Sequence, residues 1–185
     1  NDKLENIAKI YLTASGGPFL NFPISRLKKV KPVEATKHPK WKMGKKISVD
    51  SATLMNKMLE IIEAQKLFSI KISKIHIVIH PESLVHAVVK FKNGLYKFIY
   101  HDTTMIVPLA NAIFDDKILI DSIFKPKKNV TKNIFFKQLN FFEVDKKKFP
   151  IISLKSRLNE YISTPIIINA ANEILVDQFL KKKIQ

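Results

Sequence analysis

The sequence predicts an α/β fold of the α+β kind: an open, largely antiparallel sheet with helices on it, followed by a helical connecting segment. Three observations predict it. Two strand-length apolar stretches flank Asn93-Gly94, a preferred hairpin turn. A long stretch with helical periodicity covers 52–68. Two more helical stretches, about 150–161 and 165–180, close the chain.

The first part of the chain is predicted to alternate strands and loop. Ile7 to Ala14 is typical of a strand, and the breaker Ser15-Gly16-Gly17-Pro18 ends it. The basic, Pro-punctuated stretch that follows, up to Lys46, predicts a loop with short helical turns. Residues 47–50 are predicted as a short strand that leads into the long helix.

The helix over 52–68 is expected to be buried on most sides, because nearly all of its circumference is apolar. Asp50 or Ser51 can serve as its N-cap. At 3.6 residues per turn, a narrow polar stripe runs along one side. The residues in or beside this stripe are Asn56, Lys57, Glu60 and Glu63.

The second part predicts the rest of the sheet. The expected strands are 75–79, 85–92 and 95–100. Met105 to Phe114 predicts a short helix interrupted near Pro108. The segment 115–148 is weakly patterned, with a strand expected at Gln138 to Phe142.

Composition indicates a globular chain. Of 185 residues, 46% are hydrophobic, and no apolar run reaches membrane-spanning length, so no membrane partner is expected. The absence of Cys excludes a disulfide framework, thiolate metal ligands and a cysteine nucleophile. The net charge of +16, densest over 26–46, is typical either of a solvated lysine-rich face or of a surface that attracts phosphate esters or nucleic acid.

Two groups of residues favour phosphate and metal chemistry. Ser15-Gly16-Gly17 exposes backbone N–H groups after a strand, which suits a phosphate, although the same pattern makes an ordinary tight turn. On the long helix, Ser51, Asn56 and Lys57 can hold a phosphate beside a metal-binding Glu60. The alternative there is simple i,i+3 pairing of Lys57 with Glu60.

A loop with a histidine can close over such a ligand. His38 precedes Trp41, Met43 and Gly44 in the basic stretch, and a tip of this composition can exclude water. The alternative is an exposed aromatic side chain in a mobile loop. A dinucleotide fingerprint of the Gly-x-Gly-x-x-Gly type is absent from the sequence.

Several runs resemble the 1-deoxy-D-xylulose 5-phosphate reductoisomerase family. The specific runs are Leu12-Thr-Ala-Ser-Gly-Gly-Pro-Phe19, Lys37-His-Pro-Lys-Trp-Lys-Met-Gly-Lys-Lys-Ile-Ser-Val-Asp-Ser-Ala-Thr-Leu-Met-Asn-Lys57 and Leu59-Glu-Ile-Ile-Glu-Ala64. Looser matches are Ile79-His-Pro-Glu-Ser83 with His86, and Asn169-Ala-Ala-Asn-Glu173.

The resemblance implies an NADPH-dependent oxidoreductase and isomerase of the methylerythritol phosphate route to isoprenoids, which makes 2-C-methyl-D-erythritol 4-phosphate. Its cofactors are NADPH and a divalent metal: Mg²⁺, Mn²⁺ or Co²⁺. The implied substrate-binding residues are Ser15, His38, Ser51, Asn56, Lys57 and Glu60. His38 and Glu60 are implied as catalytic, Glu60 as a metal ligand, and Gly44 as a contact of NADPH. The resemblance places Trp41 and Met43 in the closing loop and His86 and Met105 in the pocket.

The resemblance also implies that this chain is an internal piece with both ends cut. Residues 1–114 would form the substrate- and metal-binding domain, and 115–185 its remainder plus a helical linker. An NADPH domain, a C-terminal domain and an Asp-Ser-Glu run with two metal carboxylates would lie elsewhere. We therefore expect the chain alone to be inactive. A homodimer without nucleic acid is expected, in the bacterial cytoplasm or, in a plastid-bearing eukaryote, the plastid.

Two departures from the family pattern stand out. Met58 occupies a position where the family usually has Gly, which bears on helix packing. Thr103-Thr104-Met105 replaces the usual Pro-Asp-Met, which bears on the cofactor side of the pocket. A basic nucleic-acid-binding module is the alternative function, supported by charge alone.

Overall fold

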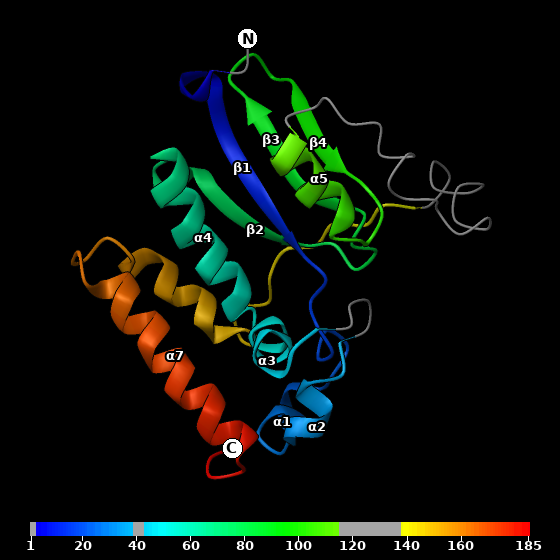
Figure 1. The fold of residues 1–185 in the computed structure, drawn as a ribbon, viewed down its shortest axis with the longest axis vertical. Coiled ribbons are helices and arrows are strands. Elements are labelled where there is room, and N and C mark those ends of the chain that lie inside the picture. Colours follow the sequence, from blue (N-terminus) through cyan, green and yellow to red (C-terminus); the bar gives the residue numbers. More distant parts are fainter. Residues whose placement is uncertain (1–2, 39–42, 115–137) are drawn as a thin grey trace.

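A computed structural model describes residues 3–38, 43–114 and 138–185 (Figure 1). The prediction for Trp41 lies outside the described residues. The elements, in chain order, are η1 (Leu4–Asn6), β1 (Ile7–Ala14), α1 (Ile24–Leu27), α2 (Pro32–Ala35), α3 (Lys45–Thr53), α4 (Met55–Phe68), η2 (Ile72–Lys74), β2 (Ile75–Ile79), β3 (Val85–Phe91), β4 (Tyr96–Tyr100), α5 (Ile106–Phe114), η4 (Pro150–Arg157) and α7 (Thr164–Leu180).

The four strands form one mixed sheet in the order β2-β1-β3-β4. β1 runs parallel to β2 and antiparallel to β3, and β3 is antiparallel to β4. The sheet with its helices confirms the predicted α+β class. The strand predicted over 7–14 is confirmed, and the basic stretch contains the expected short helical turns, α1 and α2.

The β3–β4 hairpin is confirmed, but its turn is longer than predicted. The N–H of Phe91 donates to the carbonyl of Leu95 at 2.9 Å, so Lys92, Asn93 and Gly94 lie between the paired residues. Gly94 has φ 91, the left-handed conformation that a glycine adopts without strain. Lys92 leaves the ladder because its N–H donates to the carbonyl of Asn6 at 2.9 Å.

The strand predicted at 47–50 is wrong, because these residues lie inside helix α3. The N-cap of this helix is Gly44, whose carbonyl accepts both the N–H of Ser48 at 3.1 Å and its hydroxyl at 2.8 Å. One turn of helix also brings Lys46 within 2.8 Å of the buried Asp50 carboxylate. These local interactions outweigh the strand propensity of Ile47 and Val49.

The predicted single helix over 52–68 is two helices that meet at Leu54. This residue has φ 63 and ψ 12, a left-handed conformation that costs a non-glycine residue about 1–2 kcal/mol. Its side chain is 2% exposed and packs with Ala14, Ile79 and Phe149. Burial of a leucine stabilises by roughly 1.5–3 kcal/mol, enough to offset the backbone cost.

The predicted N-cap role of Asp50 or Ser51 is also wrong, because both residues belong to α3. Ser51 lies in the last turn of that helix, and its carbonyl accepts the N–H of Leu54 at 3.3 Å. At the start of α4 it is the hydroxyl of Thr53 that accepts a backbone N–H, from Met55 at 3.3 Å.

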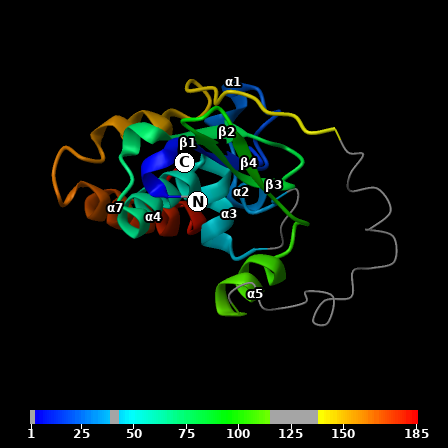
Figure 2. The same ribbon diagram turned by 90° about the horizontal axis from the view of Figure 1, so that it is seen from above.

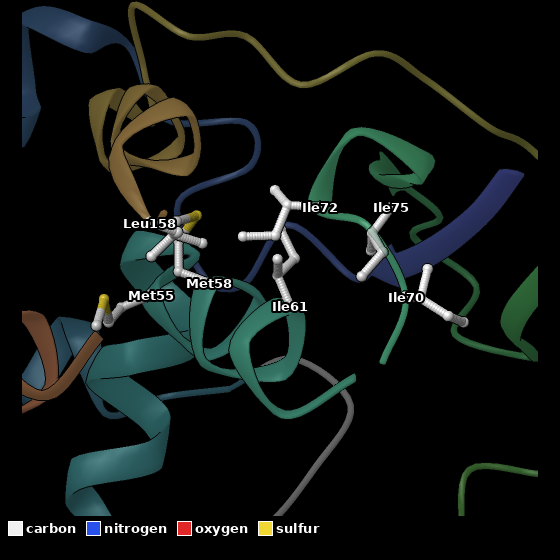
Figure 3. Close-up of a cluster of buried hydrophobic side chains, with 7 residues drawn as sticks. All are labelled: Met55, Met58, Ile61, Ile70, Ile72, Ile75 and Leu158. Carbon is white, nitrogen blue, oxygen red and sulfur yellow. The ribbon is translucent and has the colours of Figure 1, made fainter. Parts of the chain in front are cut away.

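The main core lies between the sheet, α4 and η4 (Figure 3). Its buried members, labelled in Figure 3, are Met55, Met58, Ile61, Ile70, Ile72, Ile75 and Leu158. Met58 is fully buried, so this methionine fills space in the core. Leu158 shows that residues after 138 pack into the same core as residues before 114.

The helices to one side of the sheet are layered, with α4 nearest β1 and β2, η4 next and α7 outermost (Figure 1). Seen from above, α5 stands apart from this group (Figure 2). The predicted interruption of α5 near Pro108 is wrong, because the proline falls in the first turn, where it is tolerated. No helix in the described ranges is long and apolar enough to span a membrane.

The predictions for the last third need two corrections. Of the strand predicted at 138–142, the structure has a single bridge, in which Phe142 and Ile79 exchange two N–H···O bonds of 2.9 Å. The helix predicted at 150–161 is a 3₁₀ helix that ends at Arg157. The final helix is confirmed, over Thr164–Leu180.

Candidate phosphate- and metal-binding site

The loop after β1 is folded tightly onto helix α3. The hydroxyl of Ser15 accepts the N–H of Gly17 at 3.1 Å. Gly17 has φ 62, and a Cβ at this position would lie 2.7 Å from the carbonyl oxygen of Ser51 and 3.0 Å from the Cα of Ala52. Only glycine permits this approach. The Ser15 loop and the end of α3 are therefore neighbours, as the phosphate-site hypothesis requires.

His38 joins this group from the loop after α2. Its Nε2 lies 3.0 Å from the Ser15 hydroxyl. Burial lowers the pKa of His38 below its ordinary value, because a charged imidazolium loses hydration there. A neutral His38 can exchange a proton or a hydrogen bond with a ligand held at Ser15. Met43 and Gly44, predicted beside it, lie at the entry to α3.

The first two turns of α4 hold the second group, which we call the Glu60 cluster: Asn56, Lys57 and Glu60. The Oε1 of Glu60 accepts hydrogen bonds from Asn56 Nδ2 at 2.8 Å and from Lys57 Nζ at 2.7 Å. The Oε2 of Glu60 accepts a third, from Lys57 Nζ at 2.8 Å. The amide, ammonium and carboxylate predicted on one helical stripe therefore do meet. Glu63, predicted on the same stripe, is exposed and outside the cluster.

The Lys57–Glu60 pair is also the i,i+3 pair that the alternative reading predicted. It differs from an ordinary surface pair in its burial, since the Lys57 side chain is only 17% exposed and that of Glu60 32%. A long lysine side chain held this far from water needs a counter-charge, and an incoming anion could share it.

The donor set at Glu60 fits a hard divalent cation as one part of a larger site. Carboxylate oxygen is the ligand type that Mg²⁺ and Mn²⁺ prefer, and such ions take about six oxygens. Within the described ranges, no group of three or more His, Cys, Asp or Glu side chains could hold a metal ion. Glu60 would thus supply one ligand, with the others coming from ligand, water or residues beyond those described.

His86, predicted to line the pocket, lies on β3. Its ring stacks on that of His101 at 3.7 Å between centroids, and its Nε2 lies 3.2 Å from the His101 carbonyl. Burial, and then the neighbouring His101, lower the pKa of His86 to about 4, and the positive charge of Lys57 adds to the shift. His101 was not predicted, because nothing in the sequence pairs it with His86.

Other predicted positions are less connected. Met105, predicted to line the pocket, is 56% exposed just before α5, and its role stays a prediction. His80 is fully buried and accepts the N–H of Leu84 at 3.2 Å, with its other ring nitrogen 2.8 Å from the Asn140 carbonyl. It is the structural histidine expected of a lone His at a strand end.

Comparison with known proteins finds the family that the sequence motifs resemble. Residues 1–68 match the family described as 1-deoxy-D-xylulose 5-phosphate reductoisomerase C-terminal domain, and 102–185 match the DXP reductoisomerase C-terminal domain. The enzyme of that name from Pelagibacter ubique is 44% identical over 189 residues, covering 100% of this chain and 47% of the relative. The one from a Wolbachia strain of Drosophila simulans is 46% identical, covering 96% and 45%.

Solved structures agree. A DOX-P reductoisomerase crystallised with NADPH, fosmidomycin and magnesium superposes with a TM-score of 0.83 at 38% identity, covering 97% of this chain and 43% of that one. The enzyme from Zymomonas mobilis in complex with NADPH also gives 0.83, at 34% identity, covering 97% and 45%. The chain spans about half the length of the relatives it matches.

Fold and site together define an α/β domain that presents a glycine-rich loop, an ammonium and a carboxylate around one helix junction. The chain belongs to the 1-deoxy-D-xylulose 5-phosphate reductoisomerase family.

Proposed function

We propose that this chain is the substrate- and metal-binding part of an enzyme that converts 1-deoxy-D-xylulose 5-phosphate to 2-C-methyl-D-erythritol 4-phosphate with NADPH. The observations that support the proposal are the Glu60 cluster at the start of α4 and the contact of Gly17 with Ser51, which brings the loop of Ser15 and His38 onto the end of α3. A relative crystallised with NADPH, fosmidomycin and magnesium supports the same ligand classes.

The proposed phosphate site is shared between the two groups. Ser15, Ser51 and Asn56 would donate hydrogen bonds to phosphate oxygens, and Lys57 would supply the charge. To do so, the Lys57 ammonium would have to turn from the Glu60 carboxylate toward the ligand. That movement would expose Glu60 oxygens to a cation, so phosphate and metal sites would form together.

The rest of the chemistry is divided between residues and cofactors. When bound, a divalent metal would polarise substrate oxygens, and NADPH would deliver hydride. His38 would hold a substrate hydroxyl through the nitrogen now near Ser15. We propose that Trp41 and Met43 close over the substrate to exclude water, that Gly44 contacts NADPH, and that His86 and Met105 line the pocket.

A binding experiment tests the phosphate site on this chain. Titration calorimetry with inorganic phosphate is compared for the chain, for Lys57→Met and for Lys66→Met, a control on the exposed side of the same helix. Loss of one charged hydrogen bond, about 1.5–3 kcal/mol, predicts roughly 10- to 150-fold weaker binding for Lys57→Met alone. Equal affinity for all three proteins would exclude Lys57 from the site.

The proposed metal-binding role of Glu60 needs a separate test in the complete enzyme. Glu60→Gln keeps the shape of the side chain and its bond to Asn56, but removes the charge. We expect the variant to keep phosphate binding and to lose binding of Mn²⁺, followed by electron paramagnetic resonance. Unchanged Mn²⁺ binding, or unchanged turnover, would contradict the assignment.

We propose that the chain alone does not turn over, because one carboxylate is too few to hold the metal and no dinucleotide fingerprint is present. NADPH consumption with substrate and Mn²⁺ is expected to be absent for this chain. Consumption at the rate of the entire enzyme would refute this. The alternative, a nucleic-acid-binding module, rests on charge alone, and the relatives compared above are reductoisomerases.

A homodimer through β4 is also proposed. β4 is an edge strand, and it carries exposed apolar side chains next to the turn. These are Leu95, Tyr96, Phe98 and Ile99. A second copy could pair with this edge and cover the side chains. Sedimentation should show a dimer that Ile99→Lys dissociates, whereas Ile174→Lys on α7 does not; a monomer at all concentrations would contradict the proposal.

A further inference from the structure

His86 lies at an irregular point of strand β3. In the register with β4, Val85 pairs with Tyr100. The next pair is Ala87 with Ile99, so three residues of β3 face two residues of β4. His86 is therefore the extra residue of a β-bulge. A bulge changes the direction in which a side chain points, and natural sheets carry bulges next to functional sites more often than elsewhere.

Hydrogen bonds from two neighbouring segments hold this bulge. The carbonyl of Val85 accepts the hydroxyl of Thr13 at 2.6 Å, near the end of β1. The carbonyl of Leu84 accepts the N–H of His101 at 3.0 Å, which fixes the residue that follows β4. Since Ser15 directly follows β1, the bulge lies at the same end of that strand as the loop of the candidate site.

The ring of His101 lies flat against the ring of His86. The two ring centroids are 3.7 Å apart, and the ring planes are 8° from parallel. The Nε2 of His86 also lies 3.2 Å from the His101 carbonyl. A carbonyl oxygen only accepts, so Nε2 carries the hydrogen, and Nδ1 is the acceptor of the neutral ring. His101 thus contacts His86 twice, through its ring and through its backbone.

The surroundings of the stack keep His86 neutral. Burial is the largest cause that lowers the pKa of His86, followed by the charge of His101, and Lys57 and His80 lower it further. The hydrogen bond to the His101 carbonyl opposes them in part. Asp102, the acidic residue next to His101, offers its backbone carbonyl to His101 Nδ1 at 2.7 Å. Two parallel imidazoles this close repel when both are charged, so at neutral pH His86 is an uncharged acceptor.

We propose that His101 is a positioning residue, which holds the His86 ring so that Nδ1 accepts a hydrogen bond from a hydroxyl group of the bound substrate. This inference rests on the proposed function, in which His86 lines the pocket. The hydroxyl groups of a sugar phosphate need acceptors once water is excluded from them. The stacked ring restricts the orientation of His86, and the bond to the carbonyl selects its tautomer, so the acceptor is in place before the substrate arrives.

Nitrogen nuclear magnetic resonance of the histidine rings in this chain tests the contact directly, with the His86 signals assigned by their loss in His86→Gln. His101→Ala removes the stacked ring, His101→Phe keeps a flat ring that does not titrate, and His76→Phe on β2 is the control. We expect the parent, His101→Phe and the control to show one neutral tautomer of His86, with the hydrogen on Nε2. His101→Ala should show both tautomers. The titration midpoint of His86 should rise in both His101 variants and stay unchanged in the control.

Turnover by the complete enzyme tests what the contact does. His101→Ala should lower kcat/KM for 1-deoxy-D-xylulose 5-phosphate by roughly 10- to 100-fold, and His101→Phe should restore most of it. The acidic limb of the pH profile should move to higher pH in His101→Ala, a change that lost stability alone does not produce.

The outcomes separate this inference from the proposed function. A single tautomer in His101→Ala, or equal kcat/KM for His101→Ala and His101→Phe, would overturn the role of the His101 ring. Resonance changes as expected, in a complete protein that does not turn over the substrate, would refute the proposed function and leave the hold of His101 on His86 standing.

Discussion

Replacement of Gly17 by alanine tests the contact on which the candidate site depends. The new Cβ would lie 2.7 Å from the Ser51 carbonyl oxygen and 3.0 Å from the Ala52 Cα, both backbone atoms that cannot rotate away. The residue would also keep φ 62, a conformation that favours glycine. The Ser15 loop would therefore have to lift off α3.

The size of the effect follows from two contributions. A left-handed alanine costs about 1–2 kcal/mol, and forcing a methyl group against packed backbone costs about 1–3 kcal/mol more. Gly94→Ala is the matched control, because Gly94 also has positive φ, 91, but nothing lies within 4 Å of its added Cβ. We expect Gly94→Ala to show the conformational cost alone.

Urea unfolding of both variants and the parent measures the difference. Gly17→Ala should be less stable than Gly94→Ala by about 1–3 kcal/mol, the steric contribution. It should also bind inorganic phosphate more weakly, whereas Gly94→Ala should not. Equal stability of the two variants would refute the close contact, and unchanged phosphate affinity in Gly17→Ala would refute its role in the site.

Three other predictions concern stability. Met58→Ala should lower the free energy of unfolding, measured in urea, by about 2–5 kcal/mol, because it leaves a cavity at a fully buried position. A decrease below about 1 kcal/mol, as for a surface substitution, would contradict the packing of Met58. Asp50→Ala should lower the free energy of unfolding by about 1.5–3 kcal/mol, because it breaks the bonds of Asp50 to Lys46 and to Asn172, the second of which links α3 to α7. An unchanged urea midpoint would disprove that link. The pKa of His86 is lowered to about 4 in the folded protein, so the folded state binds its proton less readily than the unfolded chain does. The free energy of unfolding that this difference protects above pH 6.5 is therefore lost as the pH falls toward 4. Between pH 7 and 4.5 the parent should lose about 1–2 kcal/mol more than His86→Gln, a value reduced from the full shift because the ring is half exposed; parallel pH profiles would show that His86 is not shifted.

Local sequence patterns predicted some elements well and others badly. The strand over 7–14 and the β3–β4 hairpin were predicted because alternation and turn residues act over a few positions. The strand at 47–50 was wrong because Ile47 and Val49 favour a strand, while a helix depends on interactions one turn apart, such as Ser48 with Gly44. The break at Leu54 could not be predicted, since leucine seldom adopts positive φ without the packing that compensates it.

The candidate site divides in the same way. The sequence by itself determined that Asn56, Lys57 and Glu60 share a helical face, because spacing of three and four residues on a helix leaves no other arrangement. Only the tertiary structure decided that Ser15 meets His38, that Gly17 lies on the Ser51 backbone, and that His86 stacks on His101. Those contacts join segments distant in the chain, and their partners are chosen by the packing of the whole fold, which no local pattern records.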